Sequence, residues 1–262
     1  MHLGPGTRAL VTGASRGIGR ALAERLAARG ATVGLAARTA REVEALADAL
    51  PGEHVVLGGT DVADRASVQA AVEAFGRIDL LVANAGIAYY EPFAEQPPER
   101  FEAMTAVNWL GTLYTVSAAL PGLLRQGSGH VVVVSSGAGL RAFPGAAVYG
   151  ATKAAQRAFA DALRHELTGT GVSVTTVHPG EVATSLHDHD RHRMPAWSRA
   201  AGRAVPAHRL ADRILRAVER DERQVFHPPA VRLLGAVHGV SPAAADAVLR
   251  RLRGPSAAPR RG

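Results

Sequence analysis

A tyrosine and a lysine stand four positions apart in the second half of the chain, at Tyr149 and Lys153. On a helix this spacing places both side chains on one face, one turn apart. A phenol beside an ammonium group suits proton transfer, because the cation lowers a phenol pKa that is about 10 in a free tyrosine. Ser136 lies thirteen residues before Tyr149, and its hydroxyl could polarise a substrate oxygen. Together these residues predict a proton donor for a carbonyl group that receives a hydride.

Lys153 is the only lysine in a chain whose Lys and Arg residues number 30. It is either a chance survivor in an arginine-rich chain or the one place where arginine cannot serve, since a guanidinium stays charged whereas the pKa of an ammonium shifts readily. The neighbouring Tyr149 and Ser136 favour the second interpretation. Ser135 competes with Ser136 for the role, and strand alternation points the two to opposite sides.

Alternating strand-like and helix-like segments must position these residues. Continuous apolar strands separated by helices predict a parallel sheet covered on both faces, which is a doubly wound, Rossmann-like α/β fold. We expect strands at Arg8–Val11, Thr32–Ala37, His54–Leu57, Leu80–Ala83, Val131–Ser135 and Ser173–His178. We expect helices at Arg16–Arg29, Arg41–Leu50, Ala66–Phe75, Pro98–Leu124 and Ala147–Leu167.

A glycine-rich turn links the first expected strand to the first helix. Glycines permit a tight turn and the close approach of a pyrophosphate to bare backbone, and the helix N-terminus offers unpaired N–H groups. A purely structural turn could look similar, but the strand before it and the helix after it favour phosphate binding. The candidate binding residues of this turn are Gly13, Ser15, Arg16, Gly17, Ile18 and Gly19.

With Thr12 before it, the glycine spacing resembles the classical short-chain dehydrogenase/reductase family, over roughly residues 7–184. Later motifs follow in the family's order. The resemblance implies that Asp61 and Val62 contact the adenine ring and that Pro179, Gly180, Val182 and Thr184 close over the nicotinamide carboxamide. Asn84, Ala85 and Gly86 are similar to the family's Asn-Asn-Ala-Gly motif, with Ala83 in place of its first asparagine.

The resemblance also implies roles for the residues around the tyrosine. Asn108 corresponds to the family's catalytic-site asparagine, and we expect it to hold a water that connects Lys153 to solvent. Lys153 would also hold the nicotinamide ribose, beside Tyr149. The catalytic residues implied are therefore Asn108, Ser136, Tyr149 and Lys153.

The end of the second strand bears on the choice between NAD(H) and NADP(H). A free ribose 2′-hydroxyl calls for a carboxylate there, but the chain has Ala37 followed by Arg38. Arg16 stands in the glycine turn, and two guanidinium groups suit a 2′-phosphate. Both arginines could also be ordinary surface residues of an arginine-rich chain. We expect NADP(H) to be the cofactor.

These features predict an NADP(H)-dependent oxidoreductase that transfers a hydride between the nicotinamide and a small-molecule carbonyl or secondary alcohol. The alternatives are a non-catalytic NADP(H)-binding regulator and a sugar-nucleotide epimerase or dehydratase on the same fold. A regulator could dispense with Tyr149 or Lys153, and the short glycine spacing counts against an epimerase. The family resemblance implies a homo-oligomer, a dimer or tetramer packed through the helices at Pro98–Leu124 and Ala147–Leu167.

Length and composition limit the other possibilities. A chain of 262 residues fits one domain, which we place at residues 1–253. It has no cysteine, no apolar run of the roughly 18 residues that span a bilayer and no recognisable signal peptide, so we expect a cytoplasmic protein. The net charge is +7, but from Arg223 onward there are seven arginines and one acid. The body therefore gives no indication of nucleic-acid binding.

The basic end is expected to form a helix at Ala243–Arg253, followed by a disordered tail at 254–262. This helix could pack at a subunit edge, cover an apolar substrate or make peripheral contact with a membrane. The histidine-rich segment His187–His192 is expected to be a solvated loop or lid. A substrate contact is an alternative for that segment; its spacing fits no helical metal chelate, and we expect no metal.

Overall fold

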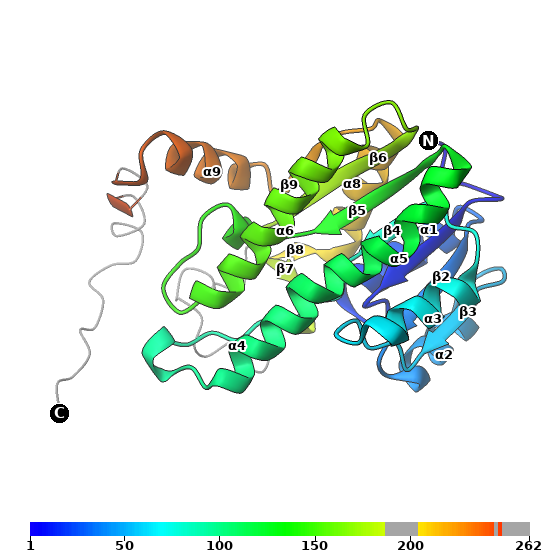
Figure 1. Ribbon diagram of the computed structural model, residues 1–262, viewed down its shortest axis with the longest axis horizontal. Helices are drawn as coiled ribbons and strands as arrows, with labels where there is room; N and C mark the ends of the chain where they lie inside the picture. The colour runs from blue at the N-terminus through cyan, green and yellow to red at the C-terminus, as the bar shows by residue number, and fades with distance from the viewer. Residues whose placement is uncertain (187–203, 244–245, 248–262) are drawn as a thin grey trace.

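The computed structural model describes residues 1–186, 204–243 and 246–247 (Figure 1). Seven parallel strands form one sheet in the order β3-β2-β1-β4-β5-β6-β9. These strands are β1 (Arg8–Thr12), β2 (Thr32–Ala37), β3 (Val55–Gly58), β4 (Leu80–Ala83), β5 (Gly129–Val134), β6 (Val172–Pro179) and β9 (Gln224–His227). A separate pair consists of β7 (Val182–Ala183) and β8 (Val205–Pro206).

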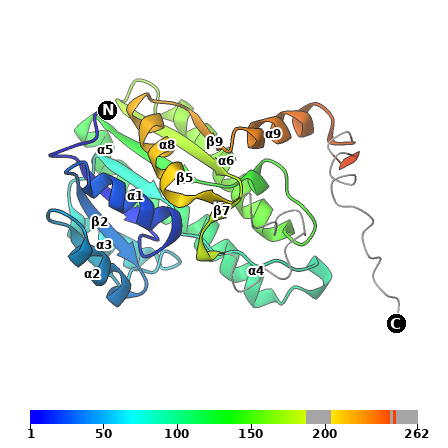
Figure 2. The same cartoon turned by 180° about the vertical axis from the view of Figure 1, so that it is seen from behind.

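Helices cover both faces of the sheet (Figures 1 and 2). Successive strand residues point to opposite faces of the sheet and belong to two hydrophobic cores. Val11 and Val82 pack against the helices on one face, and Leu10 and Leu81 pack against those on the other. Because both faces are buried, apolar residues predominate in the strands, and the predicted doubly wound α/β fold in a single domain is confirmed. The first face carries α1 (Gly17–Ala27), α2 (Ala40–Ala49) and α8 (Ala207–Glu219), and the second carries α3 (Arg65–Phe75), α5 (Gly111–Gln126) and α6 (Ala147–Glu166).

The helix expected over Pro98–Leu124 is interrupted. It consists of α4 (Pro98–Met104), the π-helical turn η2 (Thr105–Leu110) and α5, and the short 3-10 turn η1 (Phe93–Glu95) precedes it. Within the wider turn, the main-chain oxygen of Asn108 accepts hydrogen bonds from the Thr112 hydroxyl and the Gln156 amide, each at 2.8 Å. Gln156 lies on α6, so periodicity within the segment itself could not have predicted this turn.

The sequence analysis missed the last strand of the sheet and the helix before it. In α8, Leu210, Ile214, Leu215 and Val218 recur at helical spacing and are fully buried, so a periodicity signal was present. Helix α9 (Ala230–Val240) follows β9 and projects from the body of the molecule (Figures 1 and 2). Among the described residues no helix is both long and apolar enough to span a bilayer.

Three expectations fall largely outside the described residues. They are the helix at Ala243–Arg253, of which only residues 243 and 246–247 are described, the tail at 254–262 and the segment His187–His192. The domain boundary at residue 253 and the possible membrane contact of the basic end therefore stay predictions.

One buried histidine gives the fold a predictable response to acid. His130, on β5, is 2% exposed and its Nε2 lies 2.7 Å from the Thr175 hydroxyl oxygen. Thr175 donates its own proton to the Glu222 carbonyl, so His130 acts as the donor toward it. Burial lowers the pKa of His130 to about 4.

His130 should therefore destabilise the fold as the pH falls. Between pH 6.5 and 4 the unfolded chain binds this proton and the folded chain does not, so stability is complete above pH 6.5 and decreases below it. From pH 7 to pH 5 we expect a loss of about 2 kcal/mol through this residue. Urea unfolding of His130→Gln at both pH values should show a smaller loss than the parent protein. The exposed His208 provides a control, since His208→Gln should leave the difference unchanged.

Candidate active site

The site lies where the connections of the sheet change direction. From β1 the chain passes through α1 to β2 on one side, whereas β4 leads to β5 on the other. Open α/β sheets bind ligands at the carboxyl ends of their strands at such a switch point. A cavity of about 670 Å³ lies there, lined by residues from Gly13 at one end of the chain to Val231 on α9 at the other.

The glycine turn has the backbone shape that a phosphate-binding loop needs. Gly13 and Gly17 have positive φ angles of 66° and 58°, which residues with a side chain rarely adopt. α1 begins at Gly17, so its N-terminal N–H groups adjoin the cavity. Gly19 does not line the cavity: a Cβ there would lie 2.2 Å from the Gly13 oxygen, so its place in the structure is one of packing beneath the turn.

Asn84 fastens the glycine turn to the neighbouring strand. Its side-chain amide donates to the main-chain oxygen of Thr12 at 2.9 Å and to that of Gly13 at 3.3 Å. The Thr12 hydroxyl in turn accepts the main-chain N–H groups of Asn84 and Ala85 at 3.0 and 3.2 Å. The motif after β4 therefore fixes the shape of the turn as well as lining the cavity.

The end of the cavity beyond β2 and β3 holds the residues expected around the adenosine. Arg16 and Arg38 both line it, and so do Asp61 and Val62. The carboxylate of Asp61 accepts the main-chain N–H of Ala63 at 3.0 Å, which orders the segment after β3. The sequence analysis did not single out the other residues of this end, which are Thr39, Glu42 and Thr60.

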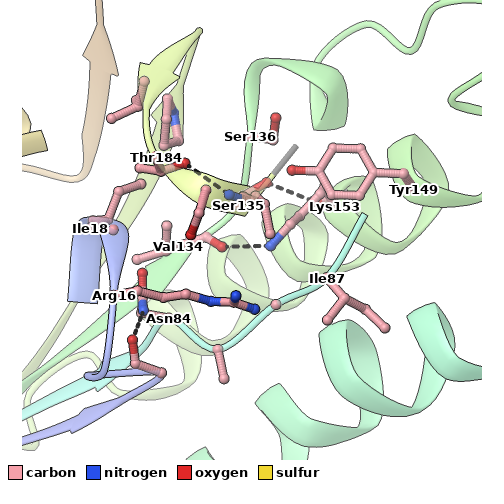
Figure 3. Close-up of a pocket in the computed structure, with 18 of the residues that line it drawn as sticks. Arg16, Ile18, Asn84, Ile87, Val134, Ser135, Ser136, Tyr149, Lys153 and Thr184 are labelled. Atoms are coloured by element: carbon pink, nitrogen blue, oxygen red, sulfur yellow. Dashed lines mark hydrogen bonds between the residues drawn. The ribbon is translucent and has the colours of Figure 1, made fainter. Parts of the chain in front are cut away.

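Ser136, Tyr149 and Lys153 come together at the other end (Figure 3). Tyr149 and Lys153 lie one turn apart on α6, and the Lys153 Nζ is 5.9 Å from the centroid of the Tyr149 ring. The ammonium group donates to the Val134 main-chain oxygen at 3.0 Å. Ser136, between β5 and the 3-10 turn η3 (Gly137–Gly139), hydrogen-bonds to the Tyr149 hydroxyl. Ser135 instead donates to the Lys153 main-chain oxygen at 2.7 Å.

Burial dominates the protonation of the tyrosine–lysine pair. It raises the pKa of Tyr149 to about 12, although the Ser136 hydrogen bond opposes the shift. It lowers the pKa of Lys153 to about 7. The expected lowering of the phenol pKa by the lysine is therefore not what this structure shows, because desolvation outweighs the neighbouring cation. At neutral pH the phenol is protonated and can act as a donor.

Asn108 lies behind the cavity and does not line it. Its side chain is fully buried, accepts the Ile87 N–H at 2.8 Å and donates to the Ile87 oxygen at 2.9 Å and the Thr152 hydroxyl at 3.1 Å. A Cβ on Gly86 would lie 3.3 Å from the Asn108 Oδ1 and 3.4 Å from the Lys153 Nζ, so Gly86 separates these two side chains. The role of holding a water stays a prediction.

The segment after β6 closes the cavity beside Tyr149. Pro179, Gly180, Val182 and Thr184 all line it, as expected. The sequence analysis missed other residues of this end, because they come from segments that lie far apart in the chain. Among them are Ile87, Tyr90, Ala138, Arg141, Phe143, Leu186, Pro228, Ala230 and Val231. Within the described ranges, no group of three acidic or histidine side chains could hold a metal ion.

A parallel sheet with a glycine turn at its switch point defines the Rossmann-like, dinucleotide-binding class of α/β proteins. The family model for short chain dehydrogenases matches residues 7–195. The chain therefore belongs to the short-chain dehydrogenase/reductase family and is an oxidoreductase of that family.

Two relatives are similar in sequence to about two thirds of the chain. The glycine betaine reductase ATRR of Emericella nidulans is 44% identical over 187 residues, which are 69% of this chain but only 15% of that protein. The oxidoreductase Lmo0432 of Listeria monocytogenes is 38% identical over 185 residues, which are 68% of this chain and 75% of that protein.

Solved structures with this fold contain either nicotinamide cofactor. A short-chain dehydrogenase/reductase of Burkholderia phymatum in complex with NAD superposes with a TM-score of 0.81 at 28% identity, covering 98% of this chain and all of that one. The closed form of a serine dehydrogenase complexed with NADP⁺ has a TM-score of 0.78 at 28% identity, covering 84% of this chain and 94% of that one. The neighbours alone do not select between the two cofactors.

Proposed function

We propose that the protein is an NADP(H)-dependent oxidoreductase that interconverts a carbonyl compound and a secondary alcohol, with Tyr149 as general acid and base. The observation that carries this proposal is the convergence of Tyr149, Ser136 and Lys153 at one end of a cavity whose other end is the glycine turn. A proton donor and a dinucleotide-binding turn in one cavity are the two requirements of such a reaction.

The residues present fit a nicotinamide dinucleotide. Side chains at Gly13 or Gly17 would strain the turn, and a Cβ on Gly13 would lie 2.9 Å from the Ala85 Cα, so bare backbone faces the cavity. Gly13, Ser15, Gly17 and Ile18 would hold the pyrophosphate against the N-terminus of α1. The residues that would hold the remaining parts are Arg16, Arg38, Asp61, Val62, Asn84, Ala85, Gly86, Tyr149, Lys153, Pro179, Gly180, Val182 and Thr184.

A nicotinamide cofactor held by these residues would supply the hydride in reduction and accept it in oxidation. In reduction, Tyr149 donates its hydroxyl proton to the substrate oxygen, and in oxidation it removes that proton. The Ser136 hydroxyl binds the same oxygen and orients it toward Tyr149. The Lys153 ammonium stabilises the negative charge on the tyrosine oxygen after proton transfer.

Loss of NADPH absorbance with a panel of ketones tests this function directly. A non-catalytic regulator would bind NADPH without oxidising it in the presence of any carbonyl compound. A sugar-nucleotide epimerase or dehydratase would act on nucleotide sugars without net consumption of the cofactor.

We further propose that Arg16 and Arg38 give a preference for NADP(H) over NAD(H). Both line the cavity at the end where β2 finishes, and Ala37 leaves no carboxylate at the end of that strand. Arg38→Asp should raise the dissociation constant of NADPH by about 10- to 100-fold, because a charge-assisted pair with the phosphate is replaced by repulsion. Fluorescence titration with both cofactors measures this change.

The neighbouring Arg41 provides the matched control. It is exposed and lies outside the cavity lining, so Arg41→Asp changes the charge by the same amount and should leave the NADPH constant within about twofold. A parent protein that binds NADH more tightly than NADPH would contradict the proposal. Glu42 also lines this end and would then be the residue to examine.

We also propose a homo-oligomer, a dimer or tetramer, that packs through the outer faces of α5 and α6. The family resemblance supports this assembly. Sedimentation velocity at micromolar protein should show a species of at least twice the 27.3 kDa chain mass, and a monomer alone would contradict it. A cytoplasmic location remains a prediction.

A further inference from the structure

The surroundings of Tyr149 are aromatic and apolar. Its ring meets that of Tyr90 edge to face at 5.8 Å, and Tyr90 stacks with Phe143 at 5.9 Å and 16°. Ile87 and Leu186 pack against the same cluster and are only partly buried. Because Ile87, Tyr90, Phe143 and Leu186 also line the cavity, apolar surface bounds the space next to the Tyr149 hydroxyl.

Val231, from the first turn of α9, supplies a facing wall. A Cβ on Gly137 would lie 3.2 Å from a Val231 methyl, and one on Gly180 would lie 3.1 Å from the other methyl. Val231 therefore touches both the loop that carries Ser136 and the segment after β6. Pro228 and Ala230 extend this wall along the cavity.

The charged lining residues are concentrated at the cofactor-binding end, where Arg16, Arg38, Glu42 and Asp61 lie. Lys153 is part of the proton-transfer group, and Glu181 belongs to the segment after β6. Among the described residues that line the cavity, Arg141 is the remaining cation, and its guanidinium is ion-paired with Asp246 of the C-terminal segment. That pairing compensates the positive charge of Arg141 beside the apolar walls.

We propose that the substrate is an uncharged carbonyl compound, or the corresponding alcohol, with an apolar and preferably aromatic group next to the reacting carbon. Phe143 and Val231 bound the space for that group, and Asp246 neutralises the arginine at its edge. This inference rests on the proposed function and adds the class of substrate. Among the described residues, these walls offer a charged group no unpaired counter-ion to replace the hydration that it would lose.

Two pairs of compounds of matched shape test the charge requirement. Acetophenone and phenylglyoxylate differ by a methyl group in place of a carboxylate, and 4,4-dimethyl-2-pentanone differs from (trimethylammonio)acetone only in carbon for nitrogen. The neutral member of each pair should have a kcat/KM at least about 100-fold higher. Equal or higher kcat/KM for the charged members would overturn the substrate class while leaving the proposed function in place. No NADPH oxidation with any compound, including simple diketones, would refute the function and this inference with it.

Substitutions of Phe143 and Val231 test whether the apolar group of the substrate binds between these two side chains. Phe143→Ala and Val231→Phe should each lower kcat/KM for acetophenone by about tenfold or more, the first by removing a ring contact and the second by filling the space. NADPH affinity and the unfolding midpoint measured alongside show that folding is intact. Phe93, which is 62% exposed and outside the cavity lining, gives the control, since Phe93→Ala should leave kcat/KM unchanged. Unchanged acetophenone kinetics in both wall variants would overturn the placement.

Asp246→Asn tests whether Asp246 neutralises the charge of Arg141 beside the substrate, because it removes the carboxylate and keeps the shape of the side chain. The variant leaves Arg141 without its carboxylate partner, so phenylglyoxylate should gain about tenfold in kcat/KM relative to acetophenone. The same ratio as in the parent protein would show that Arg141 does not face the substrate and would overturn this part of the inference.

Discussion

Tyr149→Phe is expected to lower kcat by about a thousandfold or more while leaving NADPH binding nearly unchanged. The ring and its contact with Tyr90 remain, and only the hydroxyl is lost. Since burial raises the pKa of Tyr149 to about 12, the phenol is protonated throughout the neutral range.

The measurement is single-turnover oxidation of NADPH with a saturating ketone, together with the NADPH dissociation constant. Tyr114, on α5, is partly buried in the core on the other side of the sheet from α1, so Tyr114→Phe provides the matched control and should keep full activity. A Tyr149→Phe variant that retains a tenth or more of the parent kcat would remove Tyr149 from its proposed role.

Lys153→Arg is expected to lower kcat/KM by at least about 100-fold, which corresponds to about 3 kcal/mol of transition-state stabilisation. Charge alone would predict a mild effect. Lys153 is 4% exposed, however, and its one ammonium group donates to Val134 in a space bordered by Gly86. A guanidinium is planar, carries five donors and reaches further, so it must displace a neighbour or move away from the Tyr149 oxygen. Cofactor binding should weaken as well.

The pH profile separates misplacement from loss of charge. Because burial lowers the pKa of Lys153 to about 7, the ammonium loses its proton as the pH rises through that value, and carbonyl reduction should slow above it. In Lys153→Arg the guanidinium keeps its proton, so the residual activity should not show this decline. Arg157→Lys, the reverse exchange one turn further along α6 at a side chain that is 40% exposed, should have little effect. Activity of Lys153→Arg within a few-fold of the parent protein would mean that arginine can replace the only lysine of the chain and that its presence there is due to chance.

Local spacing was enough to predict the elements of the site that depend on short stretches of chain. The glycine turn, the strand before it and the helix after it are determined within about twenty residues, because φ preferences and hydrophobic periodicity act over that range. The four-residue interval between Tyr149 and Lys153 likewise fixes their shared face on α6. β7 and β9 show where this reasoning weakens, since β7 has only two residues and β9 has a single fully buried position, Val225.

The tertiary structure decided what depends on burial and on distant segments. Charge proximity predicted a lowered phenol pKa, but the packing of Tyr90 and its neighbours around Tyr149 makes desolvation the larger effect. The π-helical turn at Asn108 depends on Gln156, 48 positions further on. Val231 reaches Gly137 from almost a hundred residues away, and only the position of the first turn of α9 beside the cavity brings them together. The sequence by itself therefore determined the family and the spacing of the residues proposed for the reaction, whereas solvent exclusion and long-range contacts, which no local pattern encodes, decided the protonation states and the walls of the pocket.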